Sequence, residues 1–238
     1  MLSFERLTGG GASSAAELLA EADLAGRAGD VRPYVFFNFV ETLDGRAAVD
    51  GSSRPLGGGG DHEMLLALRT VADAVLVGPG TIRAEGYGRL LSAERRAQPP
   101  LAVLISRRFD IPWGAGLFAA ADQPVVVYGP AGAGPAPEVA APVEVVPLAD
   151  CTPANALADL RVRGVRALLS EGGPTLFHGF LADGLVDELF LTLSPIMTSD
   201  ATQTAILSGP RLAAHARLSL SWALRHEDEL FLRYATSR

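Results

Sequence analysis

The stretch LLSEGGPTLFHGFL at residues 168–181 joins an apolar segment of strand length to an apolar segment of helical length. Between the two segments lie one acid, Glu171, and two glycines, Gly172 and Gly173. Pro174 follows directly, and proline is favoured in the first turn of a helix because its missing N–H has no partner there. The stretch therefore predicts a buried strand that turns into a helix at Pro174. Two readings stay open at this point: an ordinary turn, or a loop whose backbone N–H groups bind a phosphate.

The segments on either side repeat this alternation of strands and helices. Apolar runs of strand length occur at residues 32–40, 74–78, 100–106, 124–129, 143–147, 165–170, 187–197, 216–226 and 229–236. Helical spacing of apolar residues separates several of the middle runs, whereas the last two runs have the pattern of an antiparallel pair. The sequence thus predicts an α/β fold with a mixed, mostly parallel central sheet flanked by helices, and antiparallel strands at the C-terminal edge.

Local signals predict where several elements begin and turn. Asp61 is expected to cap the helix that follows a flexible glycine run, because its carboxylate can accept from the N–H groups of the first turn. Thr152 followed by proline predicts another helix start. The Asp-Gly pairs at 44–45 and 50–51 predict a hairpin after the first strand. Residues 1–30 are expected to form an N-terminal extension with one short helix, and residues 31–238 the main domain.

Composition narrows the functional classes. The 238-residue chain is 48% hydrophobic and carries a net charge of −7, which argues against a nucleic-acid binder. A single cysteine, Cys151, forms neither an internal disulfide nor a zinc cluster, and the four histidines lack metal-ligand spacing, so no metal site is expected. We expect neither a signal peptide nor a membrane span, and hence a soluble cytoplasmic protein.

Three predicted strand ends carry residues suited to phosphate. The sequence GPGT at 78–81 follows a strand, although alone it reads best as an ordinary turn. The sequence SRR at 106–108 suits the 2′-phosphate of NADP, and a solvated loop is an equally good reading. The third end is the Gly-Gly-Pro turn. Because a carboxylate beside a pyrophosphate would be repelled, we expect Glu171 to face a substrate instead.

The first strand and the segment after it form a fourth group. Asn38 interrupts an otherwise apolar strand, and Asp44, Ser53 and Arg69 follow. Asn38 is either a functional residue or a hydrogen-bonded asparagine of the core, and Arg69 either binds an anion or pairs with a surface carboxylate.

Taken together, three segments resemble the reductase domain of bacterial riboflavin biosynthesis. They are NFVETLDGRAAVDGSSR at 38–54, LLALRTVADAVLVGPGTIRAEGYG at 65–88 and LLSEGGPTLFHGFLADGLVDELFLTLSPIM at 168–197. The resemblance covers roughly residues 31–238 and is specific because the three motifs occur in this order. It implies a dihydrofolate-reductase-like fold, a homodimer, and the NADPH-dependent reduction of 5-amino-6-(5-phosphoribosylamino)uracil to its ribitylamino product.

The resemblance also implies roles for individual residues. The cofactor-binding residues would be Glu41, Thr81, Glu85, Ser106, Arg107, Gly172, Gly173, Pro174, Thr175 and Leu176. The substrate-binding residues would be Ser53, Arg69, Arg89 and Asp44, of which Ser53, Arg69 and Arg89 would hold the ribose phosphate. The catalytic residues would be Asn38, which orients substrate or nicotinamide, and Glu171, which holds sugar hydroxyls or assists proton transfer.

Two departures from the family concern the substrate pocket. Many bifunctional members have lysine in place of Asn38, and they have a tryptophan near Pro55 that this chain lacks. The zinc-binding deaminase domain of those members is also missing, which implies a stand-alone reductase. Two alternatives remain: an NADPH-dependent reductase of another pterin- or pyrimidine-like substrate such as dihydrofolate, and a non-catalytic NADP-binding regulator, which would bind the cofactor without turnover.

Overall fold

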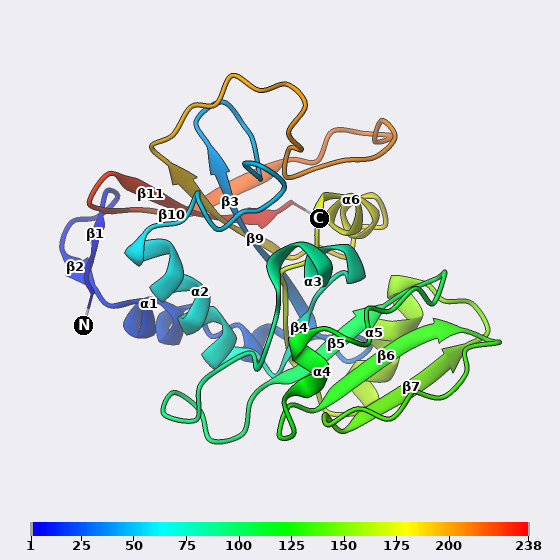
Figure 1. Cartoon of the computed structure of the whole chain (residues 1–238). Helices are drawn as coiled ribbons and strands as arrows, with labels where there is room; N and C mark the ends of the chain where they lie inside the picture. The colour runs from blue at the N-terminus through cyan, green and yellow to red at the C-terminus, as the bar shows by residue number, and fades with distance from the viewer. Residues whose placement is uncertain (1, 238) are drawn as a thin grey trace. The chain divides into compact units, whose positions relative to one another are not determined.

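The computed structural model describes residues 2–237 and divides into two units that interleave along the sequence (Figure 1). Unit 1 consists of three segments: the N-terminal segment up to Asp23, the segment Val35–Leu68, and the C-terminal segment from Pro174. Unit 2 is built from Leu24–Tyr34 and Arg69–Gly173. Each unit is described by itself below.

Unit 1 contains a mainly antiparallel set of strands. Its elements are β1 (Phe4–Arg6), β2 (Ala12–Ser13), α1 (Ala15–Ala22), β3 (Tyr34–Thr42), most of α2 (Gly59–Val71), α6 (Pro174–Ala182), β9 (Glu188–Ser194), β10 (Leu218–His226) and β11 (Glu229–Thr236). The strand order is β2-β1-β10-β11-β9-β3, and only β3 and β9 pair in parallel. The C-terminal strands thus form the antiparallel pair that the sequence predicts.

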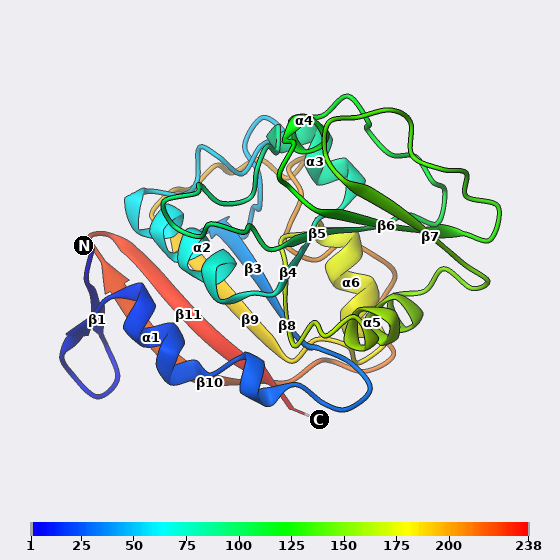
Figure 2. The ribbon, with the colours of Figure 1, turned by 90° about the horizontal axis from the view of Figure 1, so that it is seen from below.

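The two faces of the unit 1 strands differ in how they are covered. Figure 2 shows α1 and α2 in front of the strands β9, β10 and β11. On the opposite face, α6 packs on β3: the ring centroid of Phe177 lies 4.7 Å from that of Phe37 and 5.1 Å from that of Phe39. Phe180, one turn later, contacts Phe37 at 5.4 Å. Helix α6 therefore runs antiparallel to β3, and its first turn lies towards the carboxyl end of that strand.

The N-terminal segment contributes directly to unit 1. Strand β1 pairs with β10, with Glu5 opposite Arg225. Ser14 and Glu17 form a capping box at the start of α1, in which each side chain accepts from the other residue's backbone N–H. The helix buries Leu18, Leu19 and Ala22, the face expected from the sequence.

Unit 2 is a parallel sheet of five strands. Its elements are the 3₁₀ turn η1 (Ala25–Arg27), β4 (Ala74–Leu76), α3 (Pro79–Glu85), β5 (Leu101–Ile105), α4 (Gly116–Ala119), β6 (Val125–Pro130), β7 (Val143–Leu148), α5 (Pro153–Val162) and β8 (Ala167–Ser170). The order is β8-β4-β5-β6-β7, and Figure 1 shows β5, β6 and β7 side by side in green. In a parallel sheet the carboxyl ends of all strands lie at one edge, so the loops after β4, β5 and β8 are neighbours.

Three local predictions need correction or refinement. Helix α2 begins at Gly59, so Asp61 lies inside its first turn and is not the cap. The cap is the carboxylate of Glu229, which accepts from the backbone N–H groups of Gly58 (2.7 Å) and Asp61 (3.3 Å). The glycine run is thus partly helical, because Gly59 and Gly60 begin α2, and a Cβ atom at Gly58 would lie 3.1 Å from Glu229. In place of the predicted hairpin, the described chain has a single antiparallel β-bridge between Val49 and Ser52. The two residues between them, Asp50 and Gly51, have positive φ.

Within residues 2–237, no helix has both the length and the apolar character needed to cross a membrane.

Candidate active site

The loops after β4 and β8 meet at the edge of the unit 2 sheet. A Cβ atom added at Gly173 would lie 3.2 Å from the Thr81 hydroxyl, and one added at Gly78 would lie 3.6 Å from the same hydroxyl and 3.7 Å from the Gly173 nitrogen. Thr81 sits in the first turn of α3, directly after the first of these loops. Glycine is needed at Gly173 for this close approach rather than for a left-handed backbone. The arrangement leaves backbone N–H groups and one hydroxyl together, which suits a pyrophosphate.

The loop after β5 carries the residues expected near a 2′-phosphate. Ser106 is buried at the end of β5, and Arg107 beside it is exposed. Arg107 lies close enough to Cys151 to act on its thiol, although burial has the larger effect and raises the pKa of that thiol. A buried serine followed by a solvent-facing guanidinium fits an anion bound at the surface of this loop.

Arg69, Tyr87 and Glu171 form a closed hydrogen-bonded cluster in unit 2. The Nε and Nη2 atoms of Arg69 donate to the two carboxylate oxygens of Glu171, each at 2.6 Å. The Tyr87 hydroxyl donates to Glu171 Oε2 at 2.7 Å, and Arg69 Nη1 donates to the Leu90 carbonyl at 2.9 Å. The side chains of Arg69 and Glu171 are 13% and 5% exposed. The structure therefore pairs Glu171 with Arg69 and Tyr87, whereas the sequence predicts that this carboxylate faces a substrate.

Arg89 is also held within unit 2. Its Nε atom donates to Asp122 at 2.9 Å and its Nη2 atom to the Ala97 carbonyl at 3.1 Å. Its Nη1 atom is buried without a hydrogen-bond partner among residues 2–237. Glu85 ends α3, is half-buried, and its charge contributes to raising the pKa of Tyr87.

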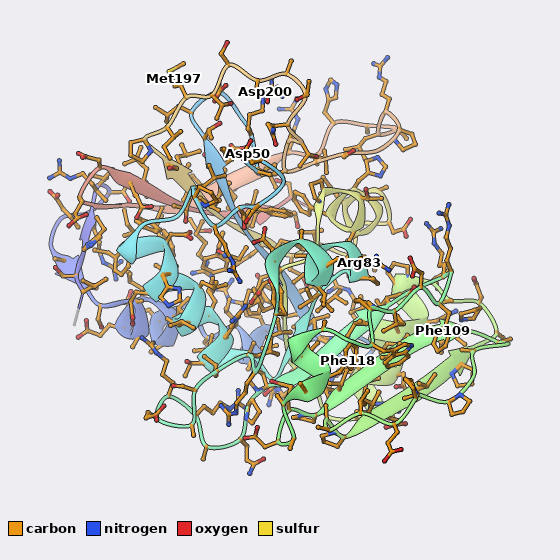
Figure 3. The ribbon with its side chains drawn as sticks, viewed as in Figure 1. Asp50, Arg83, Phe109, Phe118, Met197 and Asp200 are labelled. Carbon is orange, nitrogen blue, oxygen red and sulfur yellow. The ribbon has the colours of Figure 1, made fainter. Side chains whose placement is uncertain are left out.

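In unit 1, Asp44 joins two loops at the carboxyl ends of β3 and β9. Its carboxylate accepts from the Thr42 hydroxyl (2.5 Å), from the backbone and hydroxyl of Thr198 (both 3.2 Å) and from the Ser199 backbone (2.8 Å). These bonds, the Thr42 one foremost, hold the pKa of Asp44 well below its usual range. Asp44 thus has a structural position between the loops, which Figure 3 shows with Asp50 on the first and Asp200 on the second.

Strand β3 carries two half-buried polar side chains, those of Asn38 and Glu41. Within the described chain, neither the Asn38 amide nor the Glu41 carboxylate forms a hydrogen bond or ion pair, and both side chains are half-buried. The reading of Asn38 as a hydrogen-bonded core residue is therefore wrong. Glu41 shares the face of Phe37 and Phe39, so it lies towards the first turn of α6, and burial raises its pKa. Both groups are available to a ligand.

The remaining predicted residues lie in the same two regions. Ser53 is half-buried in the loop before α2, and its carbonyl accepts from the Leu56 N–H. Pro174, Thr175 and Leu176 form the first turn of α6, directly after Gly172 and Gly173.

Tyr87 is the residue that sequence reasoning missed. It stands between two glycines after α3 and has no pattern of its own. The sequence offered one indication of a functional role for Tyr87: it lies two residues after Glu85, in a segment expected to bind the cofactor. No group of three or more potential metal ligands occurs in residues 2–237.

The sequence of this chain matches a known protein family. The model of the RibD C-terminal domain matches residues 33–227. The chain belongs to the RibD C-terminal domain family. The family assignment and the reductase reading made from the sequence are thereby confirmed.

Individual relatives support the assignment. The chain is 28% identical to the 2,5-diamino-6-ribosylamino-4(3H)-pyrimidinone 5′-phosphate reductase of Methanothermobacter thermautotrophicus, across 86% of this chain and 98% of that protein. It is 30% identical to the riboflavin biosynthesis protein RibD of Mycobacterium tuberculosis, across 69% of this chain and 43% of RibD.

Solved structures confirm the fold. A pyrimidine reductase-like protein from Corynebacterium diphtheriae superposes with a TM-score of 0.76 at 23% identity, covering 95% of this chain and 100% of that one. The riboflavin biosynthesis reductase Rib7 of Saccharomyces cerevisiae gives 0.70 at 20% identity, with 93% and 98% coverage. The prediction of a dihydrofolate-reductase-like α/β fold is therefore confirmed for this RibD-family chain.

Proposed function

We propose that this RibD-family chain reduces 5-amino-6-(5-phosphoribosylamino)uracil to the ribitylamino product with NADPH. The observation that carries the proposal is the meeting of the loops after β4 and β8 at Thr81 and Gly173, inside a family match that spans residues 33–227. A second candidate substrate is the 2,5-diamino pyrimidinone analogue, because the relative of that name aligns over almost its whole length.

The residues fit the cofactor that the family implies. In unit 2, Thr81, Gly172 and Gly173 would hold the pyrophosphate, with Ser106 and Arg107 on the 2′-phosphate. In unit 1, the first turn of α6 offers the N–H groups of Thr175 and Leu176 next to Pro174, and Glu41 lies towards that turn. NADPH, when bound, supplies a hydride for C1′ of the substrate.

The chain's own residues would then act on the substrate. In the proposed reaction the C1′–O4′ bond breaks, O4′ takes up a proton, and the nitrogen lone pair forms a C1′=N bond that accepts the hydride at C1′. The Asn38 side chain forms no hydrogen bond within residues 2–237, so it can donate to and accept from the substrate, and it would orient the reacting part. Ser53 would contact the sugar phosphate. The protein contributes mainly orientation, because the cofactor carries the reducing power.

We further propose that residues 31–238 form the reductase, to which residues 1–30 add β1, β2 and α1. We place the enzyme in the cytoplasm, where its proposed cofactor is regenerated.

A homodimer would cover the half-exposed face of unit 1. Alternate residues on β9, β10 and β11 leave apolar side chains on the face opposite α1 and α2, namely Leu191, Leu193, Leu218, Leu220, Leu230 and Leu232. Apolar side chains that gather on one half-exposed sheet face are typical of a protein–protein interface. Sedimentation should show a dimer that Leu220→Asp converts to a monomer, whereas Val162→Asp, on the exposed side of α5, should leave it intact.

The proposed function is tested by following NADPH oxidation against three compounds. They are the phosphoribosylaminouracil, its 2,5-diamino analogue and dihydrofolate. Turnover of either ribosylamino compound well above that of dihydrofolate is expected. Exclusive turnover of dihydrofolate, or NADPH binding with no turnover of any of the three, would replace this proposal with another reductase or with a cofactor-binding regulator.

A further inference from the structure

The loop after β5 begins with a four-residue turn, residues 106–109, whose two ends are fixed to the same strand. The Ser106 N–H donates to the Tyr128 carbonyl of β6 at 2.9 Å, and the Phe109 N–H donates to the Ser106 carbonyl at 3.1 Å, which closes the turn. The ring of Phe109 lies against Gly129, the next residue of β6, because a Cβ atom added at Gly129 would come within 2.7 Å of the ring carbon Cδ2. The turn is therefore held at its first residue by Tyr128 and at its last by Gly129.

Phe109 adopts a backbone conformation that a bulky side chain disfavours. Its φ is 53°, in the left-handed region where glycine and asparagine are usual. A strained residue of this kind persists only where its surroundings hold it in place. The ring of Trp113 lies edge-on to that of Phe109, with 6.2 Å between the centroids, and Gly129 supports the other contact of the ring. Figure 3 shows the half-buried Phe109 beside the strands of unit 2. The packing of the ring thus holds a turn that its own backbone does not favour.

The two middle residues of the turn are arginines. Arg107 and Arg108 are exposed, and within residues 2–237 neither guanidinium forms a hydrogen bond or an ion pair. The acid that follows the turn, Asp110, is already engaged: its carboxylate pairs with Arg83 at 2.7 Å, and its carbonyl accepts from the same guanidinium at 2.9 Å. The turn therefore presents two guanidinium groups to solvent on a backbone that is fixed before any ligand binds.

We propose that Phe109 is a positioning residue for cofactor selectivity: its ring, seated on Gly129, fixes the 106–109 turn so that Arg107 meets the 2′-phosphate that distinguishes NADPH from NADH. The inference rests on the proposed function and deepens it. A loose turn would have to be ordered when the cofactor binds, and this ordering would weaken binding. Because only NADPH carries the 2′-phosphate, loss of the ring should weaken the binding of NADPH and leave that of NADH unchanged.

The test compares the Kd for NADPH with the Kd for NADH, both measured by calorimetry on the full chain. Phe109→Ala removes the ring, Phe109→Leu keeps an apolar contact without a flat ring, and Phe109→Tyr keeps the ring. The control is Tyr34→Ala, which removes an aromatic ring from the opposite edge of unit 2, where the Tyr34 N–H donates to the Arg166 carbonyl just before β8 begins. Circular dichroism and Tm are recorded for every variant.

The expected results separate positioning from stability. Phe109→Ala should raise the Kd for NADPH roughly three- to tenfold, the range for having to order one long side chain on binding, and should change the Kd for NADH less than about twofold. Phe109→Leu should shift the ratio of the two Kd values in the same direction, and Phe109→Tyr should keep the wild-type ratio. Tyr34→Ala should lower Tm and leave the ratio unchanged. Because Phe109 acts through Arg107, adding Phe109→Ala to Arg107→Ala should cause little further loss of selectivity.

Three results would overturn the role of Phe109 while leaving the proposed function standing. The first is a wild-type ratio in folded Phe109→Ala or Phe109→Leu. The second is equal weakening of NADPH and NADH, which would mean that the ring serves only stability. The third is full multiplication of the two losses in the double variant, which would show that Phe109 does not act through Arg107. Equal affinities for the two cofactors in wild type would instead contradict the NADPH assignment of the proposed function, and the role of Phe109 would fall with it.

Discussion

The buried aspartate in the first turn of α2 should make the stability of unit 1 depend on pH. The Oδ1 atom of Asp61 is buried without a hydrogen-bond partner among residues 2–237. The pKa of Asp61 is raised to about 6, chiefly by burial; a hydrogen bond with Thr192 lowers the pKa and the charge of Glu229 raises it. A carboxylate in this position is charged at neutral pH at a cost to the folded state.

The size and sign of the effect follow from the pKa difference. Between the usual pKa of 3.8 and the folded value of about 6, folded protein keeps a proton that the unfolded chain has lost. The free energy of unfolding therefore falls as pH rises through this window, and above pH 6 the full cost is about 3 kcal/mol. Asp61→Asn removes the charge and can keep the bond to Thr192, but it loses about 0.5 kcal/mol of favourable interaction with the helix start. We expect a net gain of about 2.5 kcal/mol at pH 7.5 and roughly 0.5 kcal/mol or less at pH 4.

Urea unfolding of wild type and Asp61→Asn at both pH values measures this directly. A gain of about 2.5 kcal/mol should raise the urea midpoint by roughly 0.8–1.2 M at pH 7.5. Asp228→Asn, an exposed aspartate in the turn between β10 and β11, serves as the control. An equal change at both pH values, or a loss of stability at pH 7.5, would refute the assignment of the cost to a buried charge.

Three further predictions concern ligand binding. Arg107→Ala should reduce the preference for NADPH over NADH by roughly tenfold, and equal affinities in wild type, by calorimetry, would remove this loop from the cofactor site. Gly173→Val should abolish NADPH binding with native circular dichroism, because its side chain would fill the space beside Thr81; normal binding would mean the loop is only a turn. Asp44→Asn should raise KM for the substrate and increase proteolysis at residues 196–204 without changing NADPH affinity, and unchanged cleavage would contradict its role in joining the two loops.

The features of the fold that depend on short segments of the sequence could be predicted. Apolar runs gave the positions of the strands, and the Gly-Gly-Pro turn was placed correctly at the start of α6 because proline and glycine restrict the backbone locally. Asn38 stood out for the same reason, as a polar residue in an apolar strand, and the structure leaves its amide available.

Interactions between distant residues were not predictable. Asp61 looked like a helix cap, yet the cap comes from Glu229, whose contact with Gly58 spans 171 residues. Glu171 was assigned from its sequence neighbours, whereas its partners Arg69 and Tyr87 lie 102 and 84 residues away. A single sequence specifies the type of each side chain and the local preferences of the backbone around it. It does not specify which oppositely charged group the fold brings next to that side chain. The presence of such a group decides whether a carboxylate is paired within the protein.

The interleaving of the two units has a consequence for how the protein is made. Strand β3 emerges early from the ribosome, but its partner within unit 1, β9, lies about 150 residues later: the Val35 N–H donates to Asp187 across 152 positions. At about 5–20 residues per second, the aromatic segment YVFFNFV waits roughly 8–30 s for that partner. The strands β4 to β8 of unit 2 are synthesised within this interval. Translation should therefore complete the unit 2 strands before β9 exists, and until β9 is made the strongly apolar β3 lacks its unit 1 partner and is a target for chaperones or for aggregation on crowded polysomes.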